Sequence, residues 1–169
     1  PATYQIVMED LICRVRGLAT VHRLLSAAEW SPLLLSELVE QIIDSALHAL
    51  PLDTYVSVEV SSSPVRVASR HANSLALITN ELTTNSAKYA WPARQTGRIC
   101  VRIDLQEDDM VLFEFRDDGV GYPEEMLHLE RHSIGWTLIQ GFVVHSLRGE
   151  MVLHNDQGAV TTIRFPVPV

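Results

Sequence analysis

Residues 99–115 carry apolar side chains at every second position on both sides of a short acidic turn at 107–109. The apolar positions before the turn are Ile99, Val101, Ile103 and Leu105, and those after it are Val111, Phe113 and Phe115. A period of two is typical of strands that bury one face. The pattern therefore predicts an antiparallel hairpin, whose apolar face another layer has to cover.

Four segments show the spacing of three or four residues between apolar positions that is typical of helices. The predicted helices span residues 4–28, 33–50, 69–90 and 133–148. We expect Ser31 to cap the second helix, with Pro32 as its first residue. Ser69 is the predicted cap of the third helix, and Gly149 is the predicted stop of the fourth.

Three more strands are predicted at residues 56–60, 151–154 and 160–165, the last two joined by a turn at 155–158. Two opening helices therefore precede a body in which helices alternate with an antiparallel-rich sheet. One helical layer packed on one sheet is the architecture that this order favours.

Composition limits the partners and the compartment. The chain has 169 residues and a net charge of −8, which argues against a nucleic-acid or anionic-membrane partner. The two cysteines, Cys13 and Cys100, are far apart and fit a reducing compartment. There is no apolar run long enough to span a membrane and no signal peptide. Because the chain starts without methionine inside a predicted helix, we expect a fragment of a longer protein. We expect this fragment to be cytoplasmic.

The third predicted helix contains Glu81, Asn85 and Lys88 at positions i, i+4 and i+7, so the three side chains share one face. An amide oxygen suits a hard cation, a lysine suits phosphate, and a carboxylate can orient a nucleophile or take its proton. Alone, the trio is read more simply as a solvated helix face.

The second half of the hairpin ends in a segment with two glycines, Asp117-x-Gly119-x-Gly121. The glycines allow a tight turn and the approach of a flat ligand, and Asp117 can accept a hydrogen bond from an exocyclic amine. Ser133 and Gly135 then open the fourth helix, whose free N–H groups suit a phosphate. Each segment alone has a plain alternative, a turn or an N-cap.

In this order, the three segments resemble the N box and the two glycine boxes of the GHKL (Bergerat) ATPase fold shared by histidine kinases, gyrase, Hsp90 and MutL. Residues 80–89, NELTTNSAKY, are similar to the N box of the HisKA_2 and HWE histidine kinases. The ending IRFP, residues 163–166, looks like the last strand of that family. The resemblance covers residues 70–166.

The resemblance implies a mixed, mostly antiparallel sheet of about five strands packed on three helices. It also implies ATP and Mg²⁺ as ligands and phosphoryl transfer to histidine as the reaction. The implied catalytic residues are Glu81 and Asn85, and Asn85 would bind Mg²⁺. The other implied ATP-binding residues are Lys88, Tyr89, Asp117, Gly119, Gly121, Ser133 and Gly135.

The opening helix resembles the second dimerisation helix of HisKA_2 kinases, with Arg14 and His22 at the typical spacing. This implies a dimerisation region at residues 1–30, a catalytic domain at 31–169, a homodimer through the N-terminal helices, and a response regulator as partner. The family's phosphoacceptor motif lies on a preceding helix and is absent here. His22 is the alternative acceptor, but its place beside Leu18 and Leu25 on an apolar stripe favours a packed or interface histidine.

Two other functions stay open. A serine-kinase anti-sigma factor has similar boxes, although such factors normally begin at the sheet. A non-catalytic phosphorelay scaffold is the third hypothesis. It is supported by Trp136, where the family has a smaller residue, and by a nucleotide lid that is poorer in glycine than is usual in the family.

Overall fold

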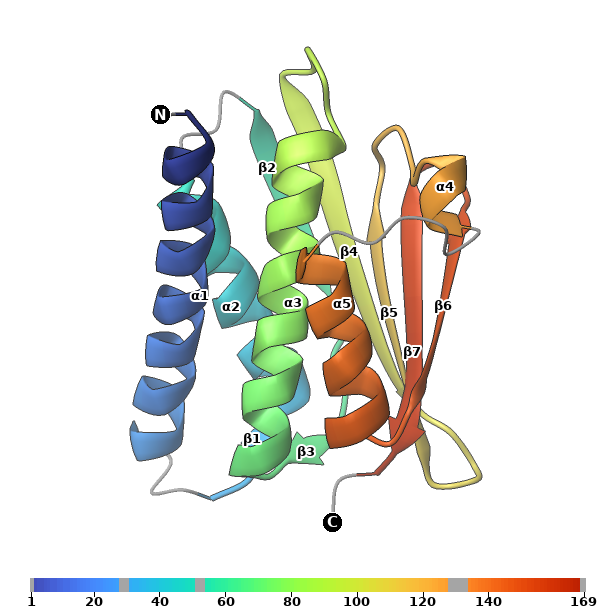
Figure 1. The fold of residues 1–169 in the computed structure, drawn as a ribbon. Coiled ribbons are helices and arrows are strands. Elements are labelled where there is room, and N and C mark those ends of the chain that lie inside the picture. Colours follow the sequence, from blue (N-terminus) through green and yellow to red (C-terminus); the bar gives the residue numbers. More distant parts are fainter. Residues whose placement is uncertain (1, 28–30, 51–53, 128–133, 168–169) are drawn as a thin grey trace.

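The computed structural model describes residues 2–27, 31–50, 54–127 and 134–167. Helices cover one face of a five-stranded sheet (Figure 1). Exposed and half-buried side chains line the outward face of the sheet. The predicted two-layer α/β architecture is confirmed.

The sheet has the strand order β2-β4-β5-β7-β6. The strands are β2 (Tyr55–Val60), β4 (Thr96–Leu105), β5 (Met110–Asp117), β6 (Glu150–Asn155) and β7 (Ala159–Pro166). The predicted hairpin is the β4–β5 pair, in which Ile103 lies opposite Phe113. Only the β2–β4 pair is parallel, and the other neighbours in this sheet are antiparallel.

The main helices are α1 (Ala2–Ala27), α2 (Leu35–Ala49), α3 (Ser69–Tyr89) and α5 (Ile134–Gly141). A four-residue helix, α4 (Glu124–Leu127), follows β5, and α5 continues into a π-helical segment, η1 (Phe142–Ser146). The helical layer and the sheet share one apolar core. Its fully buried side chains include Leu35, Ile42, Leu75, Ile78, Ile99, Phe113, Trp136 and Phe165.

The sequence predicted that Ser31 and Ser69 cap the second and third helices, and these caps are wrong in detail. Before α2, Leu33–Leu34 form a short strand, β1, that pairs with β3 (Arg66–Val67). The backbone N–H of Leu35 donates to the Val65 carbonyl at 2.9 Å, so long-range pairing replaces a side-chain cap. Ser69 is the first residue of α3, and no side chain caps either α2 or α3.

The fourth helix ends before Gly149, as predicted, but Gly149 is not the reason that it ends there. The fourth helix ends in a π turn, where the N–H of Leu147 donates to the Phe142 carbonyl at 2.9 Å, and Arg148 takes the left-handed conformation with φ 54°. A Cβ on Gly149 would lie 2.5 Å from the Arg164 carbonyl oxygen. Gly149 is therefore required by its close approach to β7.

Helix α1 has two different faces. Gly17 and Thr20 are buried where α1 packs on α2 and α3, and the hydroxyls of Thr20 and Ser45 lie 3.4 Å apart. The other face carries an apolar stripe that is exposed in this chain. Its described members, each 43–57% exposed, are Met8, Leu11, Ile12, Val15 and Leu18, of which Leu11, Val15 and Leu18 belong to the predicted stripe. The stripe therefore does not hold α1 on the body of this chain.

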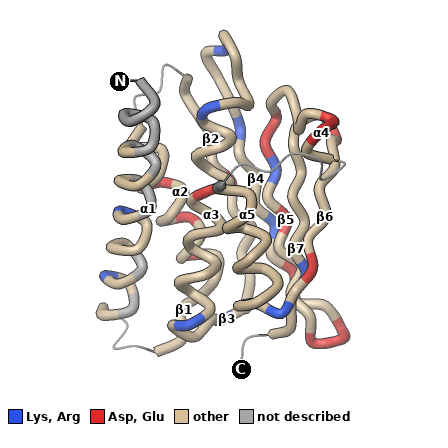
Figure 2. The backbone as a smooth tube through the Cα atoms, viewed as in Figure 1, with Lys and Arg blue, Asp and Glu red and all other residues tan. Residues whose placement is uncertain are grey.

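Charged side chains on the outward face of the sheet form ion pairs between neighbouring segments. Arg98 on β4 pairs with Glu59 on β2, and Arg116 on β5 pairs with Asp156 beyond β6. Figure 2 shows Lys and Arg positions interspersed with Asp and Glu positions along the strands. Among the described helices, none is both long and apolar enough to cross a membrane.

We expect Phe113→Ala to lower the free energy of unfolding by about 3–5 kcal/mol, because it opens a cavity in the core that the helices and the sheet share. Leu112→Ala is the matched control, since Leu112 is only half-buried on the outward face of the same strand. We expect the control to cost about 1 kcal/mol or less. Urea unfolding followed by circular dichroism measures both, and equal losses would contradict the assignment of the two faces.

Candidate nucleotide site

The predicted trio, Glu81, Asn85 and Lys88, runs along α3 from the interior of the protein to its surface. Glu81 is 7% exposed, Asn85 is half-buried and Lys88 is exposed. Tyr89, the last residue of α3, is 69% exposed. The trio shares a helix face as predicted, and its buried end is the carboxylate of Glu81.

Asp117 is the last residue of β5, and its carboxylate is 4% exposed. The Ser86 hydroxyl donates to Asp117 Oδ2 at 2.6 Å. The backbone N–H groups of Gly119 and Ala159 donate to Oδ1 at 3.0 and 3.2 Å. Three segments that are distant in sequence therefore converge on one buried acceptor.

The two predicted glycines after Asp117 are both required by close approaches. A Cβ on Gly119 would lie 2.4 Å from the Ala90 carbonyl oxygen. Gly121 has φ +83°, and a Cβ there would lie 2.8 Å from the Asn155 side chain. Asn155 accepts from the backbone N–H of Tyr122 at 2.7 Å and donates to the Tyr122 carbonyl at 2.9 Å. The loop after β5 is therefore fixed at both ends.

Tyr122 and Trp136 fill the space beside this loop. The hydroxyl of Tyr122 lies 2.5 Å from the Thr161 hydroxyl, and its ring centroid lies 6.1 Å from that of Trp136. Burial raises the pKa of Tyr122 to about 12, and the charge of Asp117 acts in the same direction, while the Thr161 hydrogen bond opposes it. Trp136 is part of the buried core under the helical layer.

The second aspartate of the loop, Asp118, has its own set of donors. Its Oδ1 accepts from Trp91 Nε1 at 2.7 Å and from the Arg98 backbone N–H at 2.8 Å, and Arg94 Nη2 donates to Oδ2 at 2.9 Å. Burial works to raise the pKa of Asp118, but these hydrogen bonds outweigh it and hold the pKa below its usual value. The carboxylate is therefore ionised at neutral pH.

The structure describes Gly135 and His22 but does not describe Ser133. Gly135 lies in the first turn of α5, close to the loop through the Trp136–Tyr122 contact. Ser133 lies outside the described residues, so its predicted place at the start of the helix is not tested. His22 is exposed on α1, so the described chain does not bury it.

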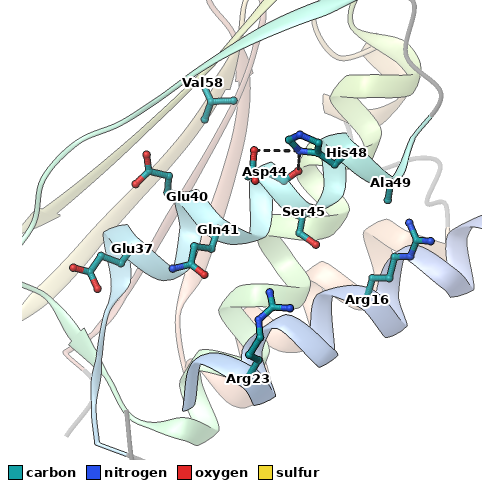
Figure 3. Close-up of a pocket in the computed structure, with 10 residues that line it drawn as sticks. All are labelled: Arg16, Arg23, Glu37, Glu40, Gln41, Asp44, Ser45, His48, Ala49 and Val58. Atoms are coloured by element: carbon teal, nitrogen blue, oxygen red, sulfur yellow. Dashed lines mark hydrogen bonds and ion pairs between the residues drawn. The ribbon is translucent and has the colours of Figure 1, made fainter. Parts of the chain in front are cut away.

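A cavity of about 700 Å³ lies elsewhere, between α1 and α2 (Figure 3). Arg16 and Arg23 on α1 face a wall of α2 that carries Glu37, Glu40 and Asp44. The carboxylates would repel a triphosphate, and none of the lining residues belongs to the predicted boxes. The cavity is therefore distinct from the candidate nucleotide site.

The candidate groups are the buried carboxylate of Asp117, the amide oxygen of Asn85, which directly precedes Ser86 on α3, and the start of α5. These groups can accept a hydrogen bond from an amine, ligate a hard cation and bind a phosphate, respectively. Sequence reasoning missed Ser86, Thr161, Asn155 and the donors to Asp118. Ser86 directly follows Asn85, so the predicted box gave a signal for it, whereas nothing local indicated the others.

Comparison with known proteins gives one family match and several similar histidine kinases. The family model described as "Histidine kinase-, DNA gyrase B-, and HSP90-like ATPase" matches residues 70–169, more than half of the chain. Blue-light-activated histidine kinase 2 of Erythrobacter litoralis is 24% identical over 126 residues, which are 74% of this chain and 36% of that protein. The chain thus spans little more than a third of that relative.

Solved structures show the same fold. A histidine kinase domain from a blue-light-activated kinase of Erythrobacter litoralis has a TM-score of 0.79 at 20% identity, covering 94% of this chain and 75% of that chain. The catalytic domain of histidine kinase ThkA has a TM-score of 0.66 at 14% identity, covering 82% and 97%. The mycobacterial sensor histidine kinase MprB has a TM-score of 0.61 at 20% identity, also covering 82% and 97%.

We expect Gly158→Ala to destabilise the chain by about 2 kcal/mol or more, because φ is +143° and a Cβ would lie 1.9 Å from the Asp117 carbonyl oxygen. Gly141→Ala is the control, since a Cβ there has no neighbour within 4 Å and Gly141 lies in a helix. The control should gain about 0.5–1 kcal/mol. Urea unfolding measures both, and a stable Gly158→Ala variant would contradict this packing.

The raised pKa of Tyr122 predicts that the free energy of unfolding falls in alkali. Its pKa is about 12 in the folded chain and 10.0 without the fold, so the unfolded chain releases the proton first. The contribution is fully present below pH 10 and is lost as pH rises toward 12. Urea unfolding at about pH 9 and about pH 11 should show a smaller loss for Tyr122→Phe than for wild type. Equal losses would mean that Tyr122 titrates normally.

Proposed function

Because the chain belongs to the family of histidine kinase-, DNA gyrase B- and HSP90-like ATPases, we propose that it is the ATP-binding catalytic domain of a two-component sensor histidine kinase. The observation that carries the proposal is the buried Asp117 carboxylate, joined through Ser86 to the helix that holds Glu81 and Asn85. The N-box sequence at 80–89 favours the HisKA_2/HWE type.

The base would be selected by Asp117. An ionised carboxylate only accepts hydrogen bonds, and of the described residues only Ser86 donates to its Oδ2. Oδ2 can therefore take a further donor, which the exocyclic amine of adenine supplies and the carbonyl of guanine does not. Gly119 and Gly121 would shape the pocket for the base, because they let the loop lie against Ala90 and Asn155, where a side chain would not fit.

The donor set on α3 fits magnesium. Asn85 offers a half-buried amide oxygen one helical turn from the Glu81 carboxylate, and hard cations prefer oxygen ligands. Mg²⁺ would neutralise charge on the phosphates when bound. We assign Asn85 as its ligand, Lys88 and the α5 start at Ser133 and Gly135 as phosphate contacts, and Tyr89 as a residue near the ribose.

The reaction would be phosphoryl transfer to a histidine on a helix that is not part of this chain. A bond forms between an imidazole nitrogen and the γ-phosphorus, the bond from that phosphorus to the β–γ bridging oxygen breaks, and ADP leaves. Glu81 would orient the imidazole and take its proton, since it is a buried carboxylate on the same helix face as Asn85.

The exposed stripe on α1 supports a helical partner for this domain. Five apolar residues spaced along one face of a 26-residue helix are typical of a seam between helices. We propose that residues 1–30 belong to a dimerisation region, that the protein forms a homodimer there, and that a response regulator receives the phosphate. His22 is exposed on this helix and remains the alternative acceptor.

Calorimetric titration with ATP and Mg²⁺ tests nucleotide binding. Wild type should bind ATP more tightly with Mg²⁺ than without it. Asn85→Ala should lose that difference, on the order of tenfold in Kd or about 1.4 kcal/mol. Asn73→Ala, an exposed asparagine on the same helix, is the control and should bind like wild type. A wild-type chain that binds no ATP would overturn the proposal and favour the scaffold alternative.

The nature of the phosphorylated residue separates the kinase alternatives. With γ-labelled ATP, the full-length parent protein should gain a label that acid removes and base does not, because phosphohistidine is acid-labile. Glu81→Gln should bind ATP and transfer slowly, since its amide cannot take the proton. An acid-stable label would indicate a phosphorylated serine and support the anti-sigma alternative.

A further inference from the structure

Asp118 lies beside the predicted adenine contact but faces the opposite way. Asp117 ends β5 and accepts from Ser86 of α3 and from Ala159, whereas Asp118, the next residue, accepts from the end of β4 and the turn after α3. The carboxylate of Asp118 accepts hydrogen bonds from the Trp91 indole, the Arg98 backbone N–H and the Arg94 guanidinium. Arg94 Nη1 also donates to the Asp118 backbone carbonyl at 2.7 Å.

We propose that Asp118, Trp91 and Arg94 form a brace that positions Asp117 and the end of α3 for nucleotide binding. In this brace, defined by those three residues, Asp118 is a positioning residue: it acts through Asp117 and makes no contact with the nucleotide. The inference rests on the proposed function, because it concerns the same site.

The brace is connected to both halves of the site by short contacts. On the loop side, the Val120 N–H donates to the Ala90 carbonyl at 2.9 Å, and Gly119 lies directly against Ala90. On the helix side, Ser86 of α3 donates to Asp117. Trp91 immediately follows Ala90, so a loop held by Asp118 is also held in register with the last turn of α3.

The contacts of the brace differ in strength. The Trp91 ring is buried over β4, where a Cβ on Gly97 would lie 2.3 Å from it, so the indole N–H is fixed toward Asp118. The side chains of Arg94 and Asp118 are 44% and 40% exposed, and exposed ion pairs contribute little. The hydrogen bond from the Trp91 indole is partly buried, and a hydrogen bond of that kind to a charged group contributes more. Trp91 therefore dominates the brace.

A loose loop would weaken nucleotide binding by a simple population effect. If the loop adopts its binding-competent position only part of the time, the apparent Kd rises by the inverse of that fraction. A brace that served only to stabilise the fold would lower Tm and leave the affinity for nucleotide unchanged. Affinity measured well below Tm therefore separates the two roles.

Four variants of the full chain test the brace by calorimetric titration with ATP and Mg²⁺. Asp118→Ala removes the acceptor and should weaken binding about tenfold. Trp91→Phe keeps the ring over Gly97 but removes the indole donor, and it should weaken binding about threefold to tenfold. Asp118→Asn keeps an oxygen for Trp91 and the Arg98 amide, and it should stay within about twofold of wild type. Asp104→Ala, which loses only the pair with Arg102 on the outward face, should bind like wild type.

The outcome that overturns the brace is equal affinity of Asp118→Ala and wild type at a temperature where both are folded. If Asp118→Ala does not fold, equal affinities of Trp91→Phe and Asp118→Asn would overturn the brace in its place. Failure of the proposed function is a different result, because then the wild-type chain itself binds no ATP.

Discussion

The buried carboxylate of Asp117 is the constraint on which the site depends. A buried charge is costly unless hydrogen bonds replace its water, and Asp117 is 4% exposed. Its donors come from α3, from its own loop and from β7, through Ser86, Gly119 and Ala159. The helical layer, the loop and the sheet must therefore all be in place before this charge is satisfied. Each of the three segments donates a hydrogen bond to Asp117, the residue that we propose as the adenine contact.

The glycines around the site follow from this constraint. For the Ala159 N–H to reach Asp117, β7 has to approach the end of β5 so closely that Gly158 leaves no space for a Cβ. For the loop to return toward α3, Gly119 has to lie against Ala90. The glycines that sequence reasoning assigned to the ligand thus also serve the packing of the protein around Asp117. Flexibility of the loop is not what they provide, since Asn155 holds it at Tyr122.

Local patterns in the sequence predicted the elements well because periodicity is a local property. The period of two in 99–115 predicted the β4–β5 hairpin, and the spacing of three or four predicted α1, α2 and α3 to within two residues at each end. What failed was set by distant partners. The start of α2 depends on pairing between Leu34 and Arg66, and the donors Ser86 and Trp91 reach aspartates 31 and 27 residues away. No spacing rule contains that information.

Helix α1 shows that a predicted apolar stripe need not be the surface that holds a helix on its own chain. The stripe is exposed, and α1 packs on the body through other residues, which include Gly17, Thr20 and the half-buried Leu24. A Cβ on Gly17 would lie 3.4 Å from Asn80 Oδ1, so α1 and α3 approach each other closely at this point. The stripe remains available on the opposite side. Because Asn80 directly precedes Glu81, the orientation of α1 and the environment of the buried carboxylate are set at neighbouring positions of one helix.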